Sequence, residues 1–137
     1  MSGYLLDTNI ASHVIRGDRL EISDRLASLP MAEVAISAVT EGELLYGLAT
    51  RDYPPLLSER VKQFLLRVEV LGWDRSVSQA YADLRASCEA KGAILAPLDM
   101  MIAAHAVAAG AVLVTRDKAF SRISGQLKTD NWITSGR

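Results

Sequence analysis

The chain has little of several features that would assign it to a class at once. Cys88 is the single cysteine among 137 residues, so no internal disulfide is possible and we expect a cytoplasmic protein. The net charge is −1, so the chain as a whole has no excess of positive charge of the kind typical of proteins that bind nucleic acid. Aromatic residues make up only 6% and hydrophobic residues 50%, so the core must consist mainly of aliphatic side chains and alanine.

The sequence also predicts no signal peptide and no membrane-spanning segment. The N-terminus lacks the basic patch, the long apolar run and the small-residue cleavage site of a signal peptide. Residues 93–114, AILAPLDMMIAAHAVAAGAVLV, are long enough to span a membrane, but Pro97, Asp99, His105 and Gly110 interrupt them. We therefore expect a strand, a helix and a second strand in this stretch, and no membrane association.

Short apolar runs alternate with amphipathic segments along the chain. Strands are predicted at 4–6, 34–37, 68–71 and 111–115, and helices at 8–15, 18–29, 40–51, 58–67, from Ser76 to the stop at Gly92, and at 99–109. The tail up to Trp132 and Ile133 predicts a further edge strand. This alternation predicts a single α/β domain over residues 1–137, with a mainly parallel sheet and helices on both faces.

Four acidic residues lie at the predicted junctions between strands and helices. Asp7 ends the first strand, and Asp117 follows the strand AVLVT by two residues. Glu43 lies in the first turn of the helix after VAIS, and Asp99 opens the helix after AILAP. Because parallel strands end at one edge of the sheet, the four carboxylates should converge there, where ligands of such sheets collect.

Each acid also has a purely structural explanation. Thr40 and Glu43 fit a capping box, and Asp7, Asp99 and Asp117 fit N-caps of helices or turns. For any one acid the two explanations are about level. Four acids on one edge would nevertheless repel one another unless a cation lay between them, so the set favours a metal site.

The residue types indicate which ion such a site would hold. Carboxylate oxygens suit Mg²⁺ or Mn²⁺, and a carboxylate-bound ion can orient a phosphodiester and activate water. Zinc does not fit, because Cys88 is alone and His13 and His105 share no ligand spacing. We interpret His105, which is surrounded by alanines, as a packed helix residue rather than a catalytic base.

Four stretches taken together resemble a known family. LLDTNI, SAVTEGELLYG, PLDMMIAAHA and LVTRDKAF occur in this order over nearly the whole chain and resemble the PIN-domain ribonucleases, with the VapC-type toxins of bacterial toxin–antitoxin pairs as the best match. The resemblance implies a three-layer α/β/α fold and a Mg²⁺- or Mn²⁺-dependent endoribonuclease that acts on structured RNA, especially tRNA. It also implies a homodimer and a small VapB-like antitoxin that wraps the toxin and blocks its cleft.

The same resemblance assigns roles to individual residues. The catalytic, metal-binding acids would be Asp7, Glu43, Asp99 and Asp117, of which the last matches the most variable site in such families. Asn9 and Thr115 match polar positions that support these acids. Glu41 is an alternative to Glu43. Residues two apart on a helix point to different sides, so only one of the two can face the metal, and the register of LLYG favours Glu43.

Basic residues could meet the phosphates of an RNA substrate around this edge. Those that could flank the cleft are Arg16, Arg19, Arg51, Arg116, Lys118 and Arg122. Arg116 and Lys118 are favoured because they adjoin Asp117, and most of the others fit a solvated surface equally well.

Two other functions remain open from the residues alone. The first is an acid-based phosphatase or phospho-acceptor domain in which Asp7 takes the phosphoryl group. Haloacid-dehalogenase-like enzymes carry D-x-D after the first strand, whereas this chain has Asp7-Thr8-Asn9. The second is a non-catalytic protein-binding module whose acids only cap helices.

Overall fold

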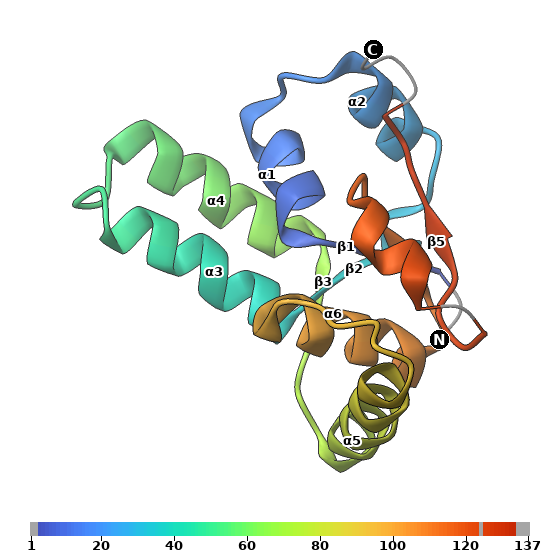
Figure 1. The fold of residues 1–137 in the computed structure, drawn as a ribbon. Coiled ribbons are helices and arrows are strands. Elements are labelled where there is room, and N and C mark those ends of the chain that lie inside the picture. The colour runs from blue at the N-terminus through green and yellow to red at the C-terminus, as the bar shows by residue number, and fades with distance from the viewer. Residues whose placement is uncertain (1–2, 124, 134–137) are drawn as a thin grey trace.

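A computed structural model describes residues 3–123 and 125–133, which form a parallel sheet covered by helices on both faces (Figure 1). The strands of this part of the chain are β1 (Tyr4–Leu6), β2 (Val34–Ser37), β3 (Glu69–Leu71), β4 (Val112–Val114) and β5 (Thr129–Asp130). Its α-helices are α1 (Thr8–Arg16), α2 (Leu20–Ala27), α3 (Ala38–Ala49), α4 (Pro55–Arg67), α5 (Arg75–Ala90) and α6 (Pro97–Ala109). Two 3₁₀ helices, η1 (Met31–Glu33) and η2 (Lys118–Arg122), lie in the connections.

The sheet has the order β3-β2-β1-β4-β5, and every pairing in it is parallel. The first strand of the chain is therefore the central one, with β2 and β4 as its neighbours. The predicted parallel α/β fold is confirmed, and so is the edge strand near the end of the chain. Strand β1 lies where the order reverses, so Asp7 follows it at the position where parallel sheets bind ligands.

Alternate residues of the central strands supply the two sides of the core, as the two-residue period of a strand requires. Leu6 and Ile36 pack with helices α1 to α4 on one face of the sheet. Leu5 and Ala35 pack with α5, α6 and η2 on the other face. The three predicted layers are confirmed, and the core consists mainly of aliphatic residues and alanine, as the composition indicated.

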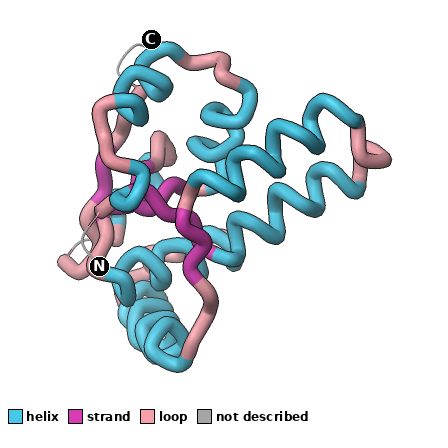
Figure 2. The backbone as a smooth tube through the Cα atoms, turned by 180° about the vertical axis from the view of Figure 1, so that it is seen from behind, coloured by secondary structure: helices cyan, strands magenta, loops and turns pink. Residues whose placement is uncertain are grey.

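Helices α3 and α4 extend together away from the sheet as an antiparallel pair, which is most visible from behind (Figure 2). The predicted break at Pro54–Pro55 is confirmed, because α3 ends at Ala49 and α4 begins with Pro55 at a position where a missing N–H costs nothing. The first turn of α3 and the last turn of α4 lie at the body of the protein, and the loop that joins the two helices stands apart from it.

Helices α2 to α6 do not begin at the predicted residues: α2 begins two residues later, at Leu20, and the other four begin one to three residues earlier. Helix α3 begins at Ala38, because the Ser37 hydroxyl accepts a hydrogen bond from the Val39 amide at 3.0 Å and caps the helix. Thr40 is thus inside the helix, and the predicted capping box of Thr40 and Glu43 does not form. Helix α5 is capped by Asp74 and not by Ser76.

The stretch 93–114 also differs in part from its prediction. Residues 93–96 form a connection and no strand, and α6 begins at Pro97 with Ala96 as its N-cap. Asp99 consequently lies in the first turn and is not the cap. The helix and the second strand of this stretch are confirmed as α6 and β4. Within the described residues, no helix combines the length and the apolar character needed to cross a bilayer.

Candidate active site

A cleft of about 510 Å³ opens at the carboxyl ends of the central strands. Its wall consists mainly of polar side chains from four separate segments, namely Asp7, Thr8, Asn9, Glu43, Asp99, Arg116, Asp117 and Phe120. The four predicted acids therefore lie along one cleft, although Asp117 follows Asp7 by 110 positions in the sequence. Glu41, the predicted alternative to Glu43, is not among the lining residues.

Asp7 is the most buried acid of the cleft, with 6% of its surface exposed. Its Oδ1 accepts a hydrogen bond from the Ile10 amide at 2.8 Å, so it does cap α1. Burial raises the pKa of Asp7, and the negative charges of Asp99 and Asp117 raise it further, against the opposing hydrogen bonds from Thr115 and Ile10. Capping and the electrostatic role coexist in this residue.

Asp99 is half-buried in the first turn of α6. Burial raises the pKa of Asp99, and the nearby charges of Asp117 and Glu43 add to this rise. The pKa values of Asp7 and Asp99 are thus both raised, mainly because the carboxylates are buried and further because negative charge gathers in the cleft. A divalent cation would reverse this effect, since it favours the ionised form of each carboxylate.

Glu43 is held by a chain of hydroxyl groups that joins α1 to α3. The Thr8 hydroxyl donates to Oε1 of Glu43 at 2.5 Å. The Thr8 and Thr40 hydroxyl oxygens are 3.1 Å apart, and because the Thr8 hydrogen is already used, Thr40 is the donor of that pair. Thr40 is fully buried. Because it does not cap α3, its hydroxyl is available to hydrogen-bond Thr8.

Thr115 connects the ends of β1 and β4. Its hydroxyl hydrogen-bonds the Asp7 side chain and accepts from the Asp117 amide at 3.0 Å. Asp117 in turn caps η2 by accepting from the Ala119 amide at 2.9 Å. The supporting role predicted for Thr115 agrees with these contacts, and the predicted supporting residue Asn9 is exposed and lines the cleft.

The two favoured basic residues differ in position. Arg116 lines the cleft, whereas Lys118 is exposed at the start of η2 and is not part of the wall. Among the residues that the structure describes, none of the four acids forms a salt bridge with a basic side chain. The acids of the cleft therefore lie near one another with no cation paired to them from the described part of the chain.

Three residues of the site were not identified from the sequence. Thr8 and Thr40 support Glu43, and Phe120 is almost fully buried and forms an apolar part of the wall. The threonines contact each other across 32 positions, so no local pattern could have found them. Phe120 follows Asp117 by three residues, and the motif LVTRDKAF was the only signal for it.

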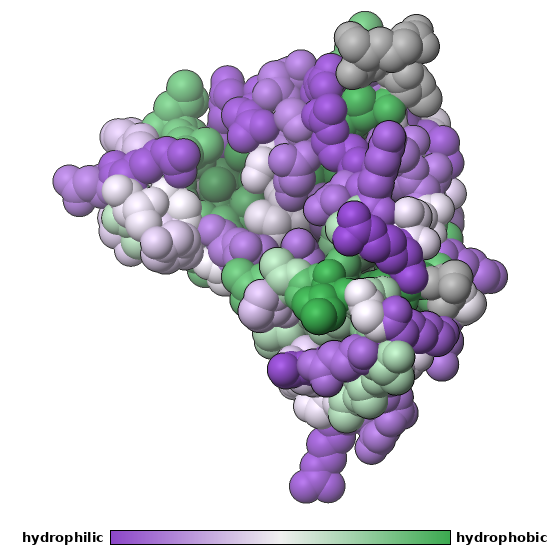
Figure 3. All heavy atoms as spheres, viewed as in Figure 1, coloured by the Kyte–Doolittle hydropathy of each residue, from purple (hydrophilic) through white to green (hydrophobic). Residues whose placement is uncertain are grey.

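A second hollow of about 400 Å³ shares Thr8 and Glu43 with the cleft. It lies between α1, α3 and α4, and it combines aliphatic side chains with Arg16 and Arg51. Apolar surface is visible between α1 and the α3–α4 pair in Figure 3, with hydrophilic residues beside it. The cleft thus adjoins a hollow that offers both positive charge and apolar surface.

The donor set of the cleft fits a hard divalent cation. All the candidate ligands are carboxylates, and oxygen atoms are the ligands that Mg²⁺ and Mn²⁺ prefer. The described residues contain no group of three or more acidic, histidine or cysteine side chains already arranged around a single point. The hydrogen bonds to Asp7, Glu43 and Asp117 leave acceptor sites free on each carboxylate, and a shift of these side chains would bring three of them around one ion.

Comparison with known proteins agrees with this architecture. Residues 4–126 match the family model of the PIN domain. The chain is 31% identical to ribonuclease VapC2 of Haemophilus influenzae, over 97% of this chain and 100% of that protein. It is 32% identical to the tRNA(fMet)-specific endonuclease VapC of Shigella flexneri, over 96% and 99% of the two chains. Its fold is similar to the crystal structure of DNA-bound VapBC from Salmonella typhimurium, with a TM-score of 0.89, 32% identity, and 97% and 100% of the two chains covered. The chain therefore belongs to the PIN-domain family, among the VapC-type toxin ribonucleases of bacterial toxin–antitoxin systems.

Proposed function

We propose that this chain is a Mg²⁺- or Mn²⁺-dependent endoribonuclease that cleaves structured RNA, with tRNA as its substrate class, as the toxin of a type II toxin–antitoxin pair. The observation that carries the proposal is the meeting of Asp7, Glu43, Asp99 and Asp117 in one cleft without a basic partner among the described residues. Repulsion between these groups is strongest when they are ionised, and a divalent cation would remove it.

Each residue of the cleft has a role in this proposal. Asp7, Glu43, Asp99 and Asp117 hold the ion, which lowers the pKa of a bound water and stabilises the leaving oxygen when it is present. Thr8 and Thr115 fix the orientation of the carboxylates of Glu43 and Asp7 through hydrogen bonds. Asn9 is an exposed amide on the wall and donates to a phosphate oxygen of the substrate.

The proposed substrate class rests on charge and on the relatives. Arg116 lies in the cleft, and Arg16 and Arg51 line the adjoining hollow, so positive side chains stand on both sides of the acids. They contact the phosphates that flank the scissile bond. The relative from Shigella flexneri is a tRNA(fMet)-specific endonuclease, which favours a tRNA substrate here.

We propose a VapB-like antitoxin as the protein partner of this chain, and a homodimer as its oligomeric state. The support is that similar structures contain toxin and antitoxin together, such as VapBC2 of Rickettsia felis bound to promoter DNA. Light scattering of the purified chain, alone and with the product of a neighbouring short reading frame, tests both statements. A monomer in solution would contradict the homodimer, and a failure to form a complex would contradict that antitoxin.

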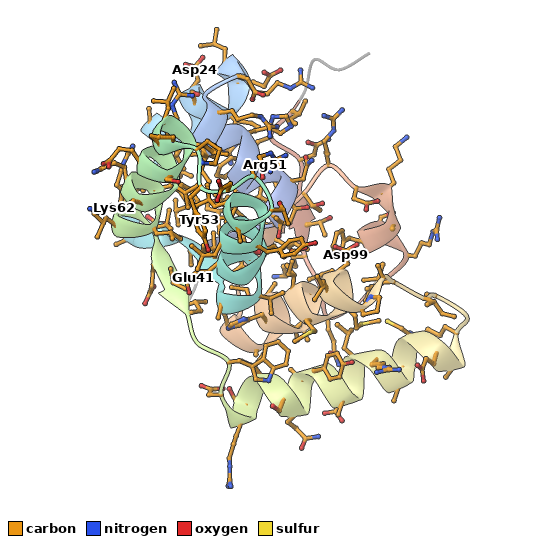
Figure 4. All side chains as sticks on the ribbon, turned by 90° about the vertical axis from the view of Figure 1, so that its left-hand side faces the viewer. Asp24, Glu41, Arg51, Tyr53, Lys62 and Asp99 are labelled. Atoms are coloured by element: carbon orange, nitrogen blue, oxygen red, sulfur yellow. The ribbon has the colours of Figure 1, made fainter. Side chains whose placement is uncertain are left out.

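Cleavage of purified tRNA tests the enzymatic proposal. Wild-type protein should cut the RNA with Mg²⁺ or Mn²⁺, and EDTA should stop the reaction. Glu43→Gln should abolish cleavage, whereas Glu41→Gln, two positions away on α3, should retain it. Asp99→Asn has a matched control in Asp24→Asn, because Asp24 is an exposed acid on α2, well apart from Asp99 (Figure 4).

Other outcomes of the same assay would support the alternatives. Release of phosphate from small esters, without RNA cleavage, would favour the phosphatase, for which membership of the PIN family gives no support. Neither activity, with only a small loss of stability in Asp7→Asn, would favour a binding module. Asp7 and Asp117 do cap α1 and η2. In a binding module, capping would be the whole role of these acids.

A pair of lysine and arginine variants tests the phosphate contacts. Arg116→Ala should raise the KM for tRNA several-fold at low salt, because Arg116 lines the cleft. Lys118→Ala should have a smaller effect, since its side chain is outside the wall. Equal effects on KM would restore the original prediction that both residues contact RNA.

A further inference from the structure

His105 is a buried polar residue that the proposed chemistry does not use. It lies on α6 with 2% of its surface exposed, and its Nδ1 is 2.7 Å from the hydroxyl oxygen of Ser37, which is fully buried. Ser37 is the N-cap of α3 and accepts from the Val39 amide with the same oxygen. One hydroxyl group therefore both begins α3 and contacts α6.

The contacts of the ring define its tautomer. His105 also hydrogen-bonds the backbone of Gly72, where the carbonyl oxygen is the acceptor available to a ring N–H. Burial lowers the pKa of His105, so the ring is neutral and carries a single N–H. With Nδ1 facing Ser37, this N–H is on Nε2, and Nδ1 accepts the hydroxyl hydrogen of Ser37. The Trp73 ring packs edge-on against the imidazole, with the ring centres 5.7 Å apart.

The position of this hydrogen bond relates it to the cleft. Ser37 precedes Glu43 by six residues, and His105 follows Asp99 by six residues on a packed neighbouring helix. Each acid is thus about 9 Å along its helix from the point where α3 and α6 are joined. In Figure 1 the first turn of α3 lies beside α6, which agrees with the contact between them.

We infer that His105 is a positioning residue, whose hydrogen bond to Ser37 fixes α3 against α6 and thereby sets the separation of Glu43 and Asp99. This inference rests on the proposed function in so far as the two acids share a cation. Thr8 and Thr40 join α3 to α1. Within the described residues, the hydrogen bond between His105 and Ser37 joins α3 to α6.

Two amide substitutions separate the contacts of His105. In His105→Asn the side-chain oxygen occupies the place of Nδ1 and keeps the bond to Ser37. In His105→Gln the amide reaches the place of Nε2 and keeps the bond to Gly72. His105→Ala removes both. Ile102→Ala is the matched control, because it truncates a buried side chain of the same helix without a direct change to the hydrogen bond.

Spin labels on exposed positions of α3 and α6 measure the separation directly, without metal or RNA. Tyr46→Cys and Ala108→Cys provide the positions, in a Cys88→Ala background that removes the buried cysteine. Wild-type protein and His105→Asn should give the same narrow distance distribution. His105→Ala and His105→Gln should shift or broaden it, and Ile102→Ala should not. Unchanged distances in His105→Ala would overturn the inference, and so would a change in His105→Asn equal to that in His105→Ala.

A titration with Mn²⁺, followed by electron paramagnetic resonance, then relates the separation to the site. His105→Ala and His105→Gln should bind Mn²⁺ at least fivefold more weakly than wild type, and His105→Asn within twofold of it. Equal Mn²⁺ affinity in wild type and His105→Ala would overturn the link to the site. Failure of the wild type to bind Mn²⁺ would instead contradict the proposed function, while the label distances would still decide the role of His105.

Discussion

Two aspartates at the two ends of α1 have opposite electrostatic surroundings. Asp7 precedes the helix, is buried among other acids, and has a raised pKa. Asp18 follows the helix just beyond Gly17, and hydrogen bonds to Arg16 at 2.9 Å and to His13 at 2.8 Å lower its pKa to about 2. The same residue type therefore has basic partners at one end of the helix and none among the described residues at the other.

The helix dipole makes this contrast more informative. The N-terminus of a helix favours a negative charge and the C-terminus disfavours one. Asp18 lies near the unfavourable end, and Arg16 and His13 compensate for it. Asp7 lies at the favourable end, but the dipole does not offset burial and the charges of Asp99 and Asp117. In these surroundings the proposed cation would favour the ionised form of Asp7.

Exchange of each aspartate for asparagine gives the largest expected difference. Asp7→Asn should lower kcat for tRNA cleavage by roughly a hundredfold or more, because several kcal/mol of transition-state stabilisation depend on the bound metal. Asn is a good N-cap, so α1 should persist, and the metal-free variant should unfold at the same temperature as wild type or higher.

Asp18→Asn should leave kcat within twofold of wild type and should reduce stability by at most about 1 kcal/mol, as is usual for an exposed ion pair. Thermal unfolding in EDTA and single-turnover cleavage measure the two effects. A clear destabilisation of metal-free Asp7→Asn would mean that Asp7 has mainly a capping role.

Removal of one hydroxyl beside Asp7 tests how the carboxylates are held. Thr8→Val keeps the shape of the side chain and removes the donor to Glu43 and the acceptor for Thr40. The affinity for Mn²⁺ should fall by about tenfold, which is typical for loss of a hydrogen bond that orients a metal ligand. Calorimetric titration of Mn²⁺ measures the change, and Ser12→Ala on the same helix is a control. Unchanged affinity would show that Glu43 reaches the ion without support from Thr8.

Addition of a divalent ion should raise the free energy of unfolding only in proteins that keep the acids of the cleft. At about 100 times its Kd, a bound ion adds about 2.7 kcal/mol to the free energy of unfolding, which raises the Tm by several degrees. Wild type and Asp18→Asn should show this rise with Mn²⁺, and Asp7→Asn and Asp99→Asn should show little of it. An equal rise in all four proteins would place the ion outside the cleft.

The dependence of stability on pH gives the smallest but most direct contrast. A raised pKa in the folded state means that Asp7 contributes stability below pH 3.8, and that this contribution is lost as the pH rises through the folded pKa. For Asp18 the folded pKa is about 2, so its contribution is present above pH 3.8 and is lost as the pH falls through about 2.

Unfolding temperatures in EDTA between pH 3 and pH 8 test these signs. Relative to wild type, Asp7→Asn should gain stability toward neutral pH, and Asp18→Asn should lose it. The sign for Asp7 would be wrong if its variant were less stable than wild type at pH 7 and equally stable near pH 3.

The sequence alone predicted the parts of the fold that depend on local periodicity. Residues 4–6 and 34–37 were correctly predicted as strands, because uninterrupted apolar runs fit strands buried on both faces. Glycines at the ends of α1 and α6 marked the stops correctly, since Gly17 and Gly110 adopt the left-handed conformation. Helix starts were less predictable, because Ser37 caps α3 from within the strand and pre-empts the sequence match at Thr40.

The acids of the candidate site could be predicted, but the groups that orient them could not. Asp7, Asp99 and Asp117 are marked by their places after a strand or at the start of a helix, which are local features. Glu43 was predicted in the first turn of its helix, but α3 begins at Ala38 and Glu43 lies in the second turn. Thr8 meets Thr40, and Ser37 meets His105 across 68 positions, only after the sheet has formed. His105 was correctly interpreted as a packed residue, but its specific partner depends on the crossing of α3 and α6.

The central place of β1 in the sheet affects when the cleft can form during translation. The chain begins with its middle strand, whose second neighbour, β4, is made only at Val112–Val114, and Asp117 follows later still. A growing polypeptide on the ribosome therefore lacks one wall of the cleft until residues as far as Asp117 have been translated. An activity that depends on all four acids cannot arise from the nascent chain before that point.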